Sequence, residues 1–219
     1  MNAETKLGCA PVVSFLTFSA LLGFSGQLLA VSPVITDRLM DCCFKKRSGA
    51  IVDTIVLHFS SDVAANPTSP YEVDKVVSIF KKAGVSAHYL IDRDGTIYRL
   101  VKEEDQAYHA GDGKLPRDTS RTELNDTSIG VELLAIGTQK EMEKIISKET
   151  YDKVKEADRG YTQKQYDSLK TLLKDITERR KEIGTDREHI IGHDEYAPNR
   201  KTDPGSLFDW AKIGLTKQP

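Results

Sequence analysis

The chain of 219 residues has little that would support a disulfide-bonded or a nucleic-acid-binding protein. It contains only three cysteines, and two of them, Cys42 and Cys43, are adjacent, so a bond between them would be strained. This excludes a disulfide framework and leaves small, partly buried side chains as the simplest interpretation. The formal net charge of −2 excludes a general electrostatic attraction to nucleic acid or anionic lipid. Any partner must therefore be recognised by a specific site.

The sequence also lacks internal repeats, low-complexity linkers and a His-Glu-x-x-His motif. The absence of that motif disfavours the common metalloprotease layout, in which two histidines on one helix bind the metal. Hydrophobic residues make up 39% and charged residues 29%, which is ordinary for a soluble globular protein. The length is sufficient for one domain with a sizeable core.

Residues 1–36 differ in composition from the rest of the chain. No charge occurs from Leu7 to Thr36, and Val12–Leu29 is mostly apolar. Lys6 precedes this run and the small residue Ala30 follows it, which is the layout of a secretory signal peptide. We therefore expect export to the periplasm or cell envelope, with secretion as the alternative. An uncleaved N-terminal anchor is also open, and only in that case would the protein contact a membrane.

Residues 37–219 alternate between strand-like and helix-like segments, which predicts a single α/β domain with a central mixed β-sheet flanked by helices. Asp94-Gly95 predicts a hairpin turn, and Thr162 with Gln165 predicts a helix start with a capping box. Gly184 is expected to close that helix. The expected strands are Ile51–His58, His88–Ile91, Thr96–Val101, Ser128–Ile136 and His189–His193, and the expected helices are Tyr71–Lys82 and Thr162–Ile183.

The segment 138–160 is a charged insertion, with many lysines and glutamates and few apolar residues. Mixed-sign charges at helical spacing predict a solvated helix. A mobile flap over the active site is the alternative, because the segment directly follows the strand that carries Glu132.

Two of the five histidines, His58 and His193, fall at the ends of predicted strands, where open α/β sheets commonly bind ligands. Gly192 leaves room for close approach beside His193. Asp203 follows in a Pro/Gly-rich loop, and Lys201 would point the same way as Asp203 if that loop is extended. Two histidines and one carboxylate leave a fourth coordination position open, as in catalytic zinc sites. We therefore predict one Zn²⁺ at the C-terminal ends of the strands, held by His58, His193 and Asp203.

The other histidines are weaker candidates. His189 would lie about 13 Å from His193 along a strand, too far to share a metal with it. His88 and Tyr89 alternate on one strand, so only one of them can face the site. His109 lies on a loop and is a candidate for the wall of the cleft.

Seven short stretches occur in an order that is typical of one enzyme family. They are Ile55-Val56-Leu57-His58, Ser86–Ile91 with Arg93-Asp94-Gly95, Tyr108-His109-Ala110-Gly111, Asn125–Glu132, Tyr161-Thr162 with Gln165, Gly192-His193-Asp194, and Ala197-Pro198 with Arg200–Gly205. With them the chain resembles the zinc-dependent N-acetylmuramoyl-L-alanine amidases, whose fold is shared with phage amidases and animal peptidoglycan recognition proteins. The resemblance extends from about Asp53 to Trp210.

The resemblance implies an enzyme that hydrolyses the amide bond between N-acetylmuramic acid and L-alanine of peptidoglycan or muropeptides. It implies that His58, His193 and Asp203 bind the zinc and that the fourth position is left for the attacking water. Glu132 and Lys201 would do the acid–base and electrostatic work. His109 and Asn125 would contact the substrate.

Ala87, Glu132 and Asp203 together resemble the bacterial branch of the family that trims muropeptides during wall recycling. That branch includes a cytoplasmic form and an envelope form, and the N-terminal signal favours the envelope form here. Phage amidases and recognition proteins typically carry Tyr where this chain has Ala87, and Cys where it has Asp203. Two other functions stay open. One is a binding module of the same fold that does not cut peptidoglycan, and the other is a zinc peptidase that cuts within the stem peptide.

Overall fold

The computed structural model describes Met1 and residues 32–216. Most of the predicted signal or anchor segment therefore lies outside the described residues. None of the helices in the described part of the chain is both long and apolar enough to cross a membrane. The predicted boundary between residues 36 and 37 falls inside a strand, Ile35–Asp37, that belongs to the sheet. The sequence did not show this strand because it is short and becomes recognisable only through its pairing with Ile97–Arg99.

A six-stranded mixed sheet forms the centre of the fold, in the order β1-β5-β4-β7-β3-β8. Most neighbours are parallel, and β4 and β5 form the antiparallel hairpin. A separate antiparallel pair joins β2 to β6. The strands are β1 Ile35–Asp37, β2 Phe44–Lys46, β3 Thr54–Ser60, β4 Tyr89–Ile91, β5 Ile97–Arg99, β6 Asp105–Ala107, β7 Ser128–Leu134 and β8 Ile190–Gly192. The predicted fold class and the predicted hairpin are confirmed.

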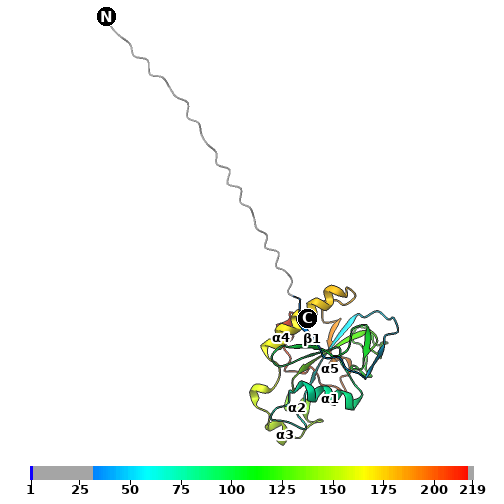
Figure 1. Cartoon of the computed structure of the whole chain (residues 1–219), viewed down its shortest axis with the longest axis vertical. Coiled ribbons are helices and arrows are strands. Elements are labelled where there is room, and N and C mark those ends of the chain that lie inside the picture. Colours follow the sequence, from blue (N-terminus) through cyan, green and yellow to red (C-terminus); the bar gives the residue numbers. More distant parts are fainter. Residues whose placement is uncertain (2–31, 217–219) are drawn as a thin grey trace. The chain divides into compact units, whose positions relative to one another are not determined.

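Helices cover both faces of the sheet. Figure 1 shows α4 on one face and α1 on the other. The helices are α1 Val73–Ala83, α2 Gln139–Met142, α3 Lys148–Asp152, α4 Gln163–Arg179 and α5 His193–Tyr196, with 3₁₀ turns η1 Glu156–Asp158 and η2 Trp210–Ile213. The leucine and isoleucine stripe of α4 packs on the larger core cluster, and Val76, Val77 and Phe80 of α1 pack on a second one. Cys42 and Cys43 are partly buried against this second cluster.

Alternation along β3 and β7 decides which side chains reach the site. Ile55 and Leu57 of β3 point into the α4 core together with Val131 of β7. Because successive residues of a strand point to opposite faces, His58 and Glu132 point to the other face. These two residues are direct partners in the β3–β7 register. Strand β3 ends at Ser60, two residues later than predicted, because its pairing with β7 continues as far as Leu134.

The predicted helix start at Thr162 is confirmed, since Thr162 and Gln165 form the reciprocal capping box. Its predicted end at Ile183 with Gly184 as the cap is wrong. Helix α4 ends at Arg179, and Arg180 has left helical geometry. Arg179 and Arg180 both bind the carboxylate of Glu103, which is only 5% exposed. This buried acid, distant in sequence, holds the chain where the pattern alone would have continued the helix.

The prediction of one solvated helix over residues 138–160 is also wrong. The segment forms α2, α3 and η1, because the side chains of Thr138 and Ser147 each cap a separate helix. Four of its apolar residues are buried in a cluster with Val63 and Ile136, whereas Ile145 is exposed. The four are Met142, Ile146, Tyr151 and Val154. The segment is therefore packed onto the domain through these side chains.

Candidate metal centre and active site

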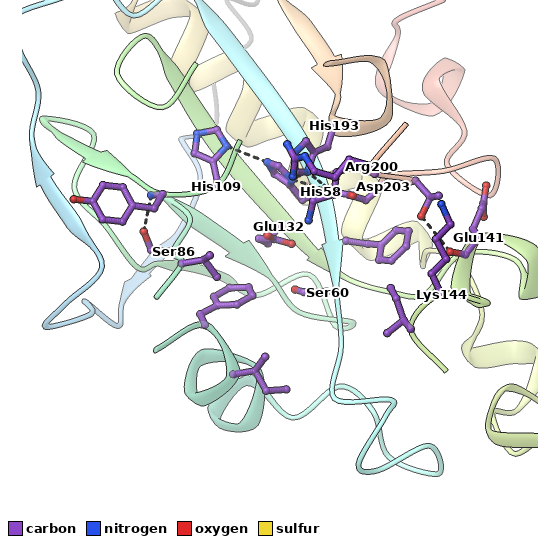
Figure 2. Close-up of a pocket in the computed structure, with 18 of the residues that line it drawn as sticks. His58, Ser60, Ser86, His109, Glu132, Glu141, Lys144, His193, Arg200 and Asp203 are labelled. Carbon is purple, nitrogen blue, oxygen red and sulfur yellow. Dashed lines mark hydrogen bonds and ion pairs between the residues drawn. The ribbon is translucent and has the colours of Figure 1, made fainter. Parts of the chain in front are cut away.

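Three potential metal ligands meet at the ends of β3 and β8 (Figure 2). His58 comes from β3, His193 is the first residue of α5, and Asp203 lies in the loop that follows. The Nδ1 atom of His58 is 2.9 Å from Nδ1 of His193 and 2.9 Å from Oδ2 of Asp203. The third side of this triangle, from His193 Nδ1 to Asp203 Oδ2, is 3.0 Å. The three side chains are almost completely buried, and their donor atoms converge.

The charge state of these groups suits a metal ion. Burial, followed by the neighbouring His193, lowers the pKa of His58 to about 4, so its imidazole is neutral at pH 7. Burial alone would raise the pKa of Asp203, but the contacts with His193 and His58 outweigh this and hold it well below its usual range. A neutral imidazole and an ionised carboxylate are the forms that coordinate metals. Nitrogen and oxygen donors in this number fit a catalytic zinc ion.

The loop that carries Asp203 is fastened to the ligand histidine's helix. The backbone N–H of Asp194 donates to the carbonyl of Asp203 at 2.7 Å. Tyr161 donates its hydroxyl to the carbonyl of Pro204 at 2.7 Å. A Cβ at Gly192 would lie 2.8 Å from Cδ of Pro204, so only glycine permits this approach. The close approach predicted for Gly192 is therefore present, and its neighbour is the loop of Asp203.

Glu132 lies beside this group, on β7, and is only 9% exposed (Figure 2). Its Oε2 atom is buried and has no hydrogen-bond partner among the described residues. Burial and the charge of Asp203 raise the pKa of Glu132 to about 8, against the opposing effects of Ser60 and Lys201. A carboxylate on the protein surface would keep a pKa near the ordinary value of 4.5. Such a buried acid beside a candidate metal centre is typical of catalytic sites.

The raised pKa predicts how stability depends on pH in the metal-free protein. Between the ordinary value of 4.5 and about 8, Glu132 holds its proton in the folded state and loses it in the unfolded state. Stability from this group therefore falls as pH rises through that window, by at most about 1.4 kcal/mol per pH unit. We expect Glu132→Gln to remove this slope. Urea unfolding of both proteins from pH 5 to pH 8 would measure it, and parallel curves would contradict the assignment.

The candidate site opens into a cavity of about 390 Å³. Lys201 lines it and is partly exposed, without an ion pair to any residue in the described part of the chain. Lys144 and Arg200 add two further cations to the wall, as Figure 2 shows. The segment 138–160 contributes Glu141, Lys144 and Ile145, so it forms one side of the cavity. Its movement as a flap stays a prediction.

Of the two residues predicted to contact the substrate, only His109 lines the cavity. His109 lines the cavity, and its Nδ1 lies 3.1 Å from Nε2 of His58. Asn125 is not among the residues that line this cavity. Its side-chain oxygen accepts the backbone N–H groups of His109 and Ala110. In this structure the side chain of Asn125 therefore holds the backbone of residues 109 and 110 in place and does not face the cavity.

His88 and Tyr89 are both buried, and neither lines the cavity. His88 accepts the backbone N–H of Gly130 and lies behind the site. His189 pairs with Asp186, away from the ligand group.

Sequence reasoning missed Ser60 and Arg47. Ser60 lines the cavity near Glu132, and its position two residues after His58 on one strand was the available signal. Arg47 donates hydrogen bonds to the backbone carbonyls of Asn125, Asp126 and Ser128. Nothing in the sequence near Arg47 indicates these contacts.

Comparisons with known proteins identify relatives of this chain. Residues 48–206 match the family model described as N-acetylmuramoyl-L-alanine amidase. The chain is 34% identical over 129 residues to the 1,6-anhydro-N-acetylmuramyl-L-alanine amidase AmpD of Escherichia coli, covering 59% of this chain and 56% of that protein. It is 30% identical over 170 residues to the N-acetylmuramoyl-L-alanine amidase AmiD of the same organism, covering 74% of this chain and 52% of that protein. The chain thus spans about half the length of the curated relatives it matches.

Among solved structures, a complex of Escherichia coli AmiD with anhydro-N-acetylmuramic acid-L-Ala-D-γ-Glu-L-Lys superposes with a TM-score of 0.58 at 30% identity. The match covers 80% of this chain and 63% of that one.

Proposed function

Because this chain belongs to the N-acetylmuramoyl-L-alanine amidase family, we propose that it hydrolyses the amide bond between N-acetylmuramic acid and L-alanine in peptidoglycan or muropeptides. One observation carries this proposal for the chain itself. The buried group of His58, His193 and Asp203 lies beside the buried acid Glu132, in one cavity. A metal-dependent hydrolase uses this combination of a Lewis-acid site and a proton carrier.

We propose one zinc ion as the cofactor, held by Nδ1 of His58, Nδ1 of His193 and Oδ2 of Asp203. Zinc, when bound, polarises a carbonyl and lowers the pKa of water to about 7. The donor set of two imidazoles and one carboxylate supports zinc over magnesium or calcium, which prefer oxygen donors alone.

Glu132 is proposed to move the proton. Its carboxylate takes a proton from the attacking water as the oxygen adds to the amide carbon. When the carbon–nitrogen bond breaks, the same carboxyl gives that proton to the leaving amine of L-alanine. In the metal-free protein the pKa of Glu132 is raised to about 8. The positive charge of a bound zinc ion would lower this pKa and so favour the ionised carboxylate that the first step needs. The products are the lactyl carboxylate of the muramic acid and the free peptide.

Lys201 is proposed to stabilise the negative oxygen of the tetrahedral intermediate. Lys201 lines the same cavity, and its ammonium group has no carboxylate partner among the described residues. For Lys201→Met we expect kcat to fall about 100-fold with little change in KM, because the charge it neutralises exists only in the transition state. Steady-state kinetics would test this, with Lys140→Met as the control, because Lys140 is an exposed lysine that does not line the cavity. An unchanged kcat would contradict the role.

The names of the relatives indicate which substrate to try first. AmpD is named a 1,6-anhydro-N-acetylmuramyl-L-alanine amidase, and AmiD has been solved with anhydro-N-acetylmuramic acid-L-Ala-D-γ-Glu-L-Lys. We therefore propose anhydro-muropeptides released from the wall as substrates, consistent with a place in muropeptide recycling.

The test is to incubate the purified protein with anhydro-muropeptides and with intact peptidoglycan, with and without a zinc chelator. Mass spectrometry would identify the products. Free stem peptide that begins with L-alanine and forms only when zinc is available supports the proposal. Cuts within the stem peptide would indicate a peptidase, and binding without cleavage would indicate a peptidoglycan-binding module.

We propose export to the periplasm or cell envelope on the basis of the uncharged run that follows Lys6. Cleavage after Ala30 would leave β1 intact, because that strand begins at Ile35. N-terminal sequencing of the protein recovered from cell fractions would test this. A cytoplasmic protein that retains Met1 would contradict export.

A further inference from the structure

We propose that His109 is a positioning residue for the metal centre: together with the carbonyl of Ala110 it fixes which ring nitrogen carries the proton in both ligand histidines. The inference rests on the proposed metal site, and it explains why a loop distant in sequence is held so firmly against that site. A histidine binds metal through an unprotonated nitrogen, so the tautomer decides whether the donor atom is available.

The donor and acceptor atoms in the contact between His58 and His109 follow from the hydrogen bonds of Ser128, which also contacts His109. Ser128 Oγ lies 2.6 Å from the carbonyl of Leu124 and 3.1 Å from Nε2 of His109. A carbonyl can only accept, so the single hydroxyl proton of Ser128 points to Leu124. The contact with His109 must then be donated by the ring, which places the proton of His109 on Nε2.

The same reasoning continues to the metal ligand. The two ring nitrogens of His109 face the hydroxyl of Ser128 and the imidazole of His58. No carboxylate of the described residues lies within hydrogen-bond distance of this ring to favour its charged form. With the proton on Nε2, its Nδ1 is an acceptor and receives Nε2–H of His58 at 3.1 Å. Nδ1 of His58 is therefore unprotonated, and it is this atom that faces His193 and Asp203.

The second ligand histidine is set by the next residue of the loop. Nε2 of His193 lies 2.8 Å from the carbonyl of Ala110, which accepts the Nε2 proton. In the neutral tautomer with this proton, Nδ1 of His193 is the atom with the free lone pair, and it faces Asp203. Two consecutive residues, His109 and Ala110, therefore hold both imidazoles in the form that can bind zinc.

Hydrogen bonds from other parts of the chain hold His109 and Ala110 in position. The side-chain oxygen of Asn125 accepts the N–H of His109 at 3.0 Å and that of Ala110 at 2.8 Å. Arg47 in turn donates to the carbonyl of Asn125 at 3.0 Å. A Cβ on Gly130 would lie 2.5 Å from Cγ of His109, so the ring rests directly on the backbone of β7. Figure 2 shows His109 beside His58 at the edge of the site.

The experiment compares the wild-type full chain with His109→Leu and His109→Gln. Leucine cannot accept the proton of His58, whereas the amide oxygen of glutamine can. We measure zinc affinity by competition with a chelator, and the protonated ring nitrogens of the metal-free protein by ¹⁵N NMR. We expect His109→Leu to weaken zinc binding by about 10–100-fold, the usual effect of losing such a partner. His109→Gln should recover most of this loss.

The NMR measurement requires neither zinc nor activity, so it separates this inference from the proposed function. We expect Nε2 of His58 to be protonated in the wild type and the tautomer to become mixed in His109→Leu. If His109→Leu does not fold, Ser128→Ala provides the second variant, with the same mixed tautomer expected. His189→Gln is the matched control, since His189 pairs with Asp186 and should leave both readouts unchanged. Wild-type zinc affinity in His109→Leu, or a proton on Nδ1 of His58 in the wild type, would overturn the inference.

Discussion

Replacing Glu132 with glutamine is expected to reduce kcat/KM by about 10³-fold while zinc affinity stays at the wild-type level. General acid–base catalysis contributes about 10²–10⁴-fold, and glutamine can neither accept nor return the proton. Zinc should stay bound because Glu132 is not part of the ligand triangle. The shape of the buried site is retained, since glutamine and glutamate are nearly equal in size. Steady-state kinetics with an anhydro-muropeptide and zinc analysis of the same preparations would check both statements.

The matched control is Glu143→Gln, which removes an exposed carboxylate on the neighbouring segment that does not line the cavity. It should retain wild-type kinetics. If Glu132→Gln also retained them, another group would have to carry the proton. If it lost zinc, Glu132 would be part of the metal centre rather than a proton carrier.

Asp203→Ala is expected to lose both zinc and turnover. The substitution removes one of the three donors and, with it, the negative charge that balances the ion. Loss of an outer partner alone costs about 10–100-fold in affinity, so loss of a direct ligand should exceed 100-fold. Activity should fall to the level of the chelator-treated wild type. Competition titration with a chelator and product analysis would measure the two losses.

Two further variants make the test of Asp203 specific. Asp203→Cys supplies a thiolate, which is also a zinc ligand, and should recover part of the affinity. Asp194→Asn changes a partly buried carboxylate next to His193 that lies outside the ligand group, and it should retain zinc. Loss of zinc in Asp194→Asn, or full affinity in Asp203→Ala, would contradict the proposed ligand set.

Prediction from the sequence was most successful where one local pattern decides the structure. The apolar runs of β3 and β7 predict buried strands because both faces of these strands are covered. The start of α4 follows from Thr162 and Gln165, which satisfy each other's backbone groups within one turn. The end of α4 could not be predicted, since it depends on Glu103, which lies 76 residues from Arg179 in the chain.

The charged segment 138–160 shows the same limit. Charge at helical spacing predicted one exposed helix, but the caps at Thr138 and Ser147 divide it. Its buried apolar residues meet Val63, which belongs to a loop far earlier in the chain. The residue pattern within 138–160 therefore could not predict its packing against Val63.

The sequence by itself determined which chemical groups are available: two histidines and an aspartate in family positions, a glutamate on a central strand and a lysine two residues before the aspartate. Only the tertiary structure decided their state. The pKa of Glu132 rises because several remote segments bury it beside Asp203. The proton positions of His58 and His193 depend on residues 51 and 83 positions away. Protonation depends on burial and on hydrogen-bond partners, and both are fixed only when distant segments pack together.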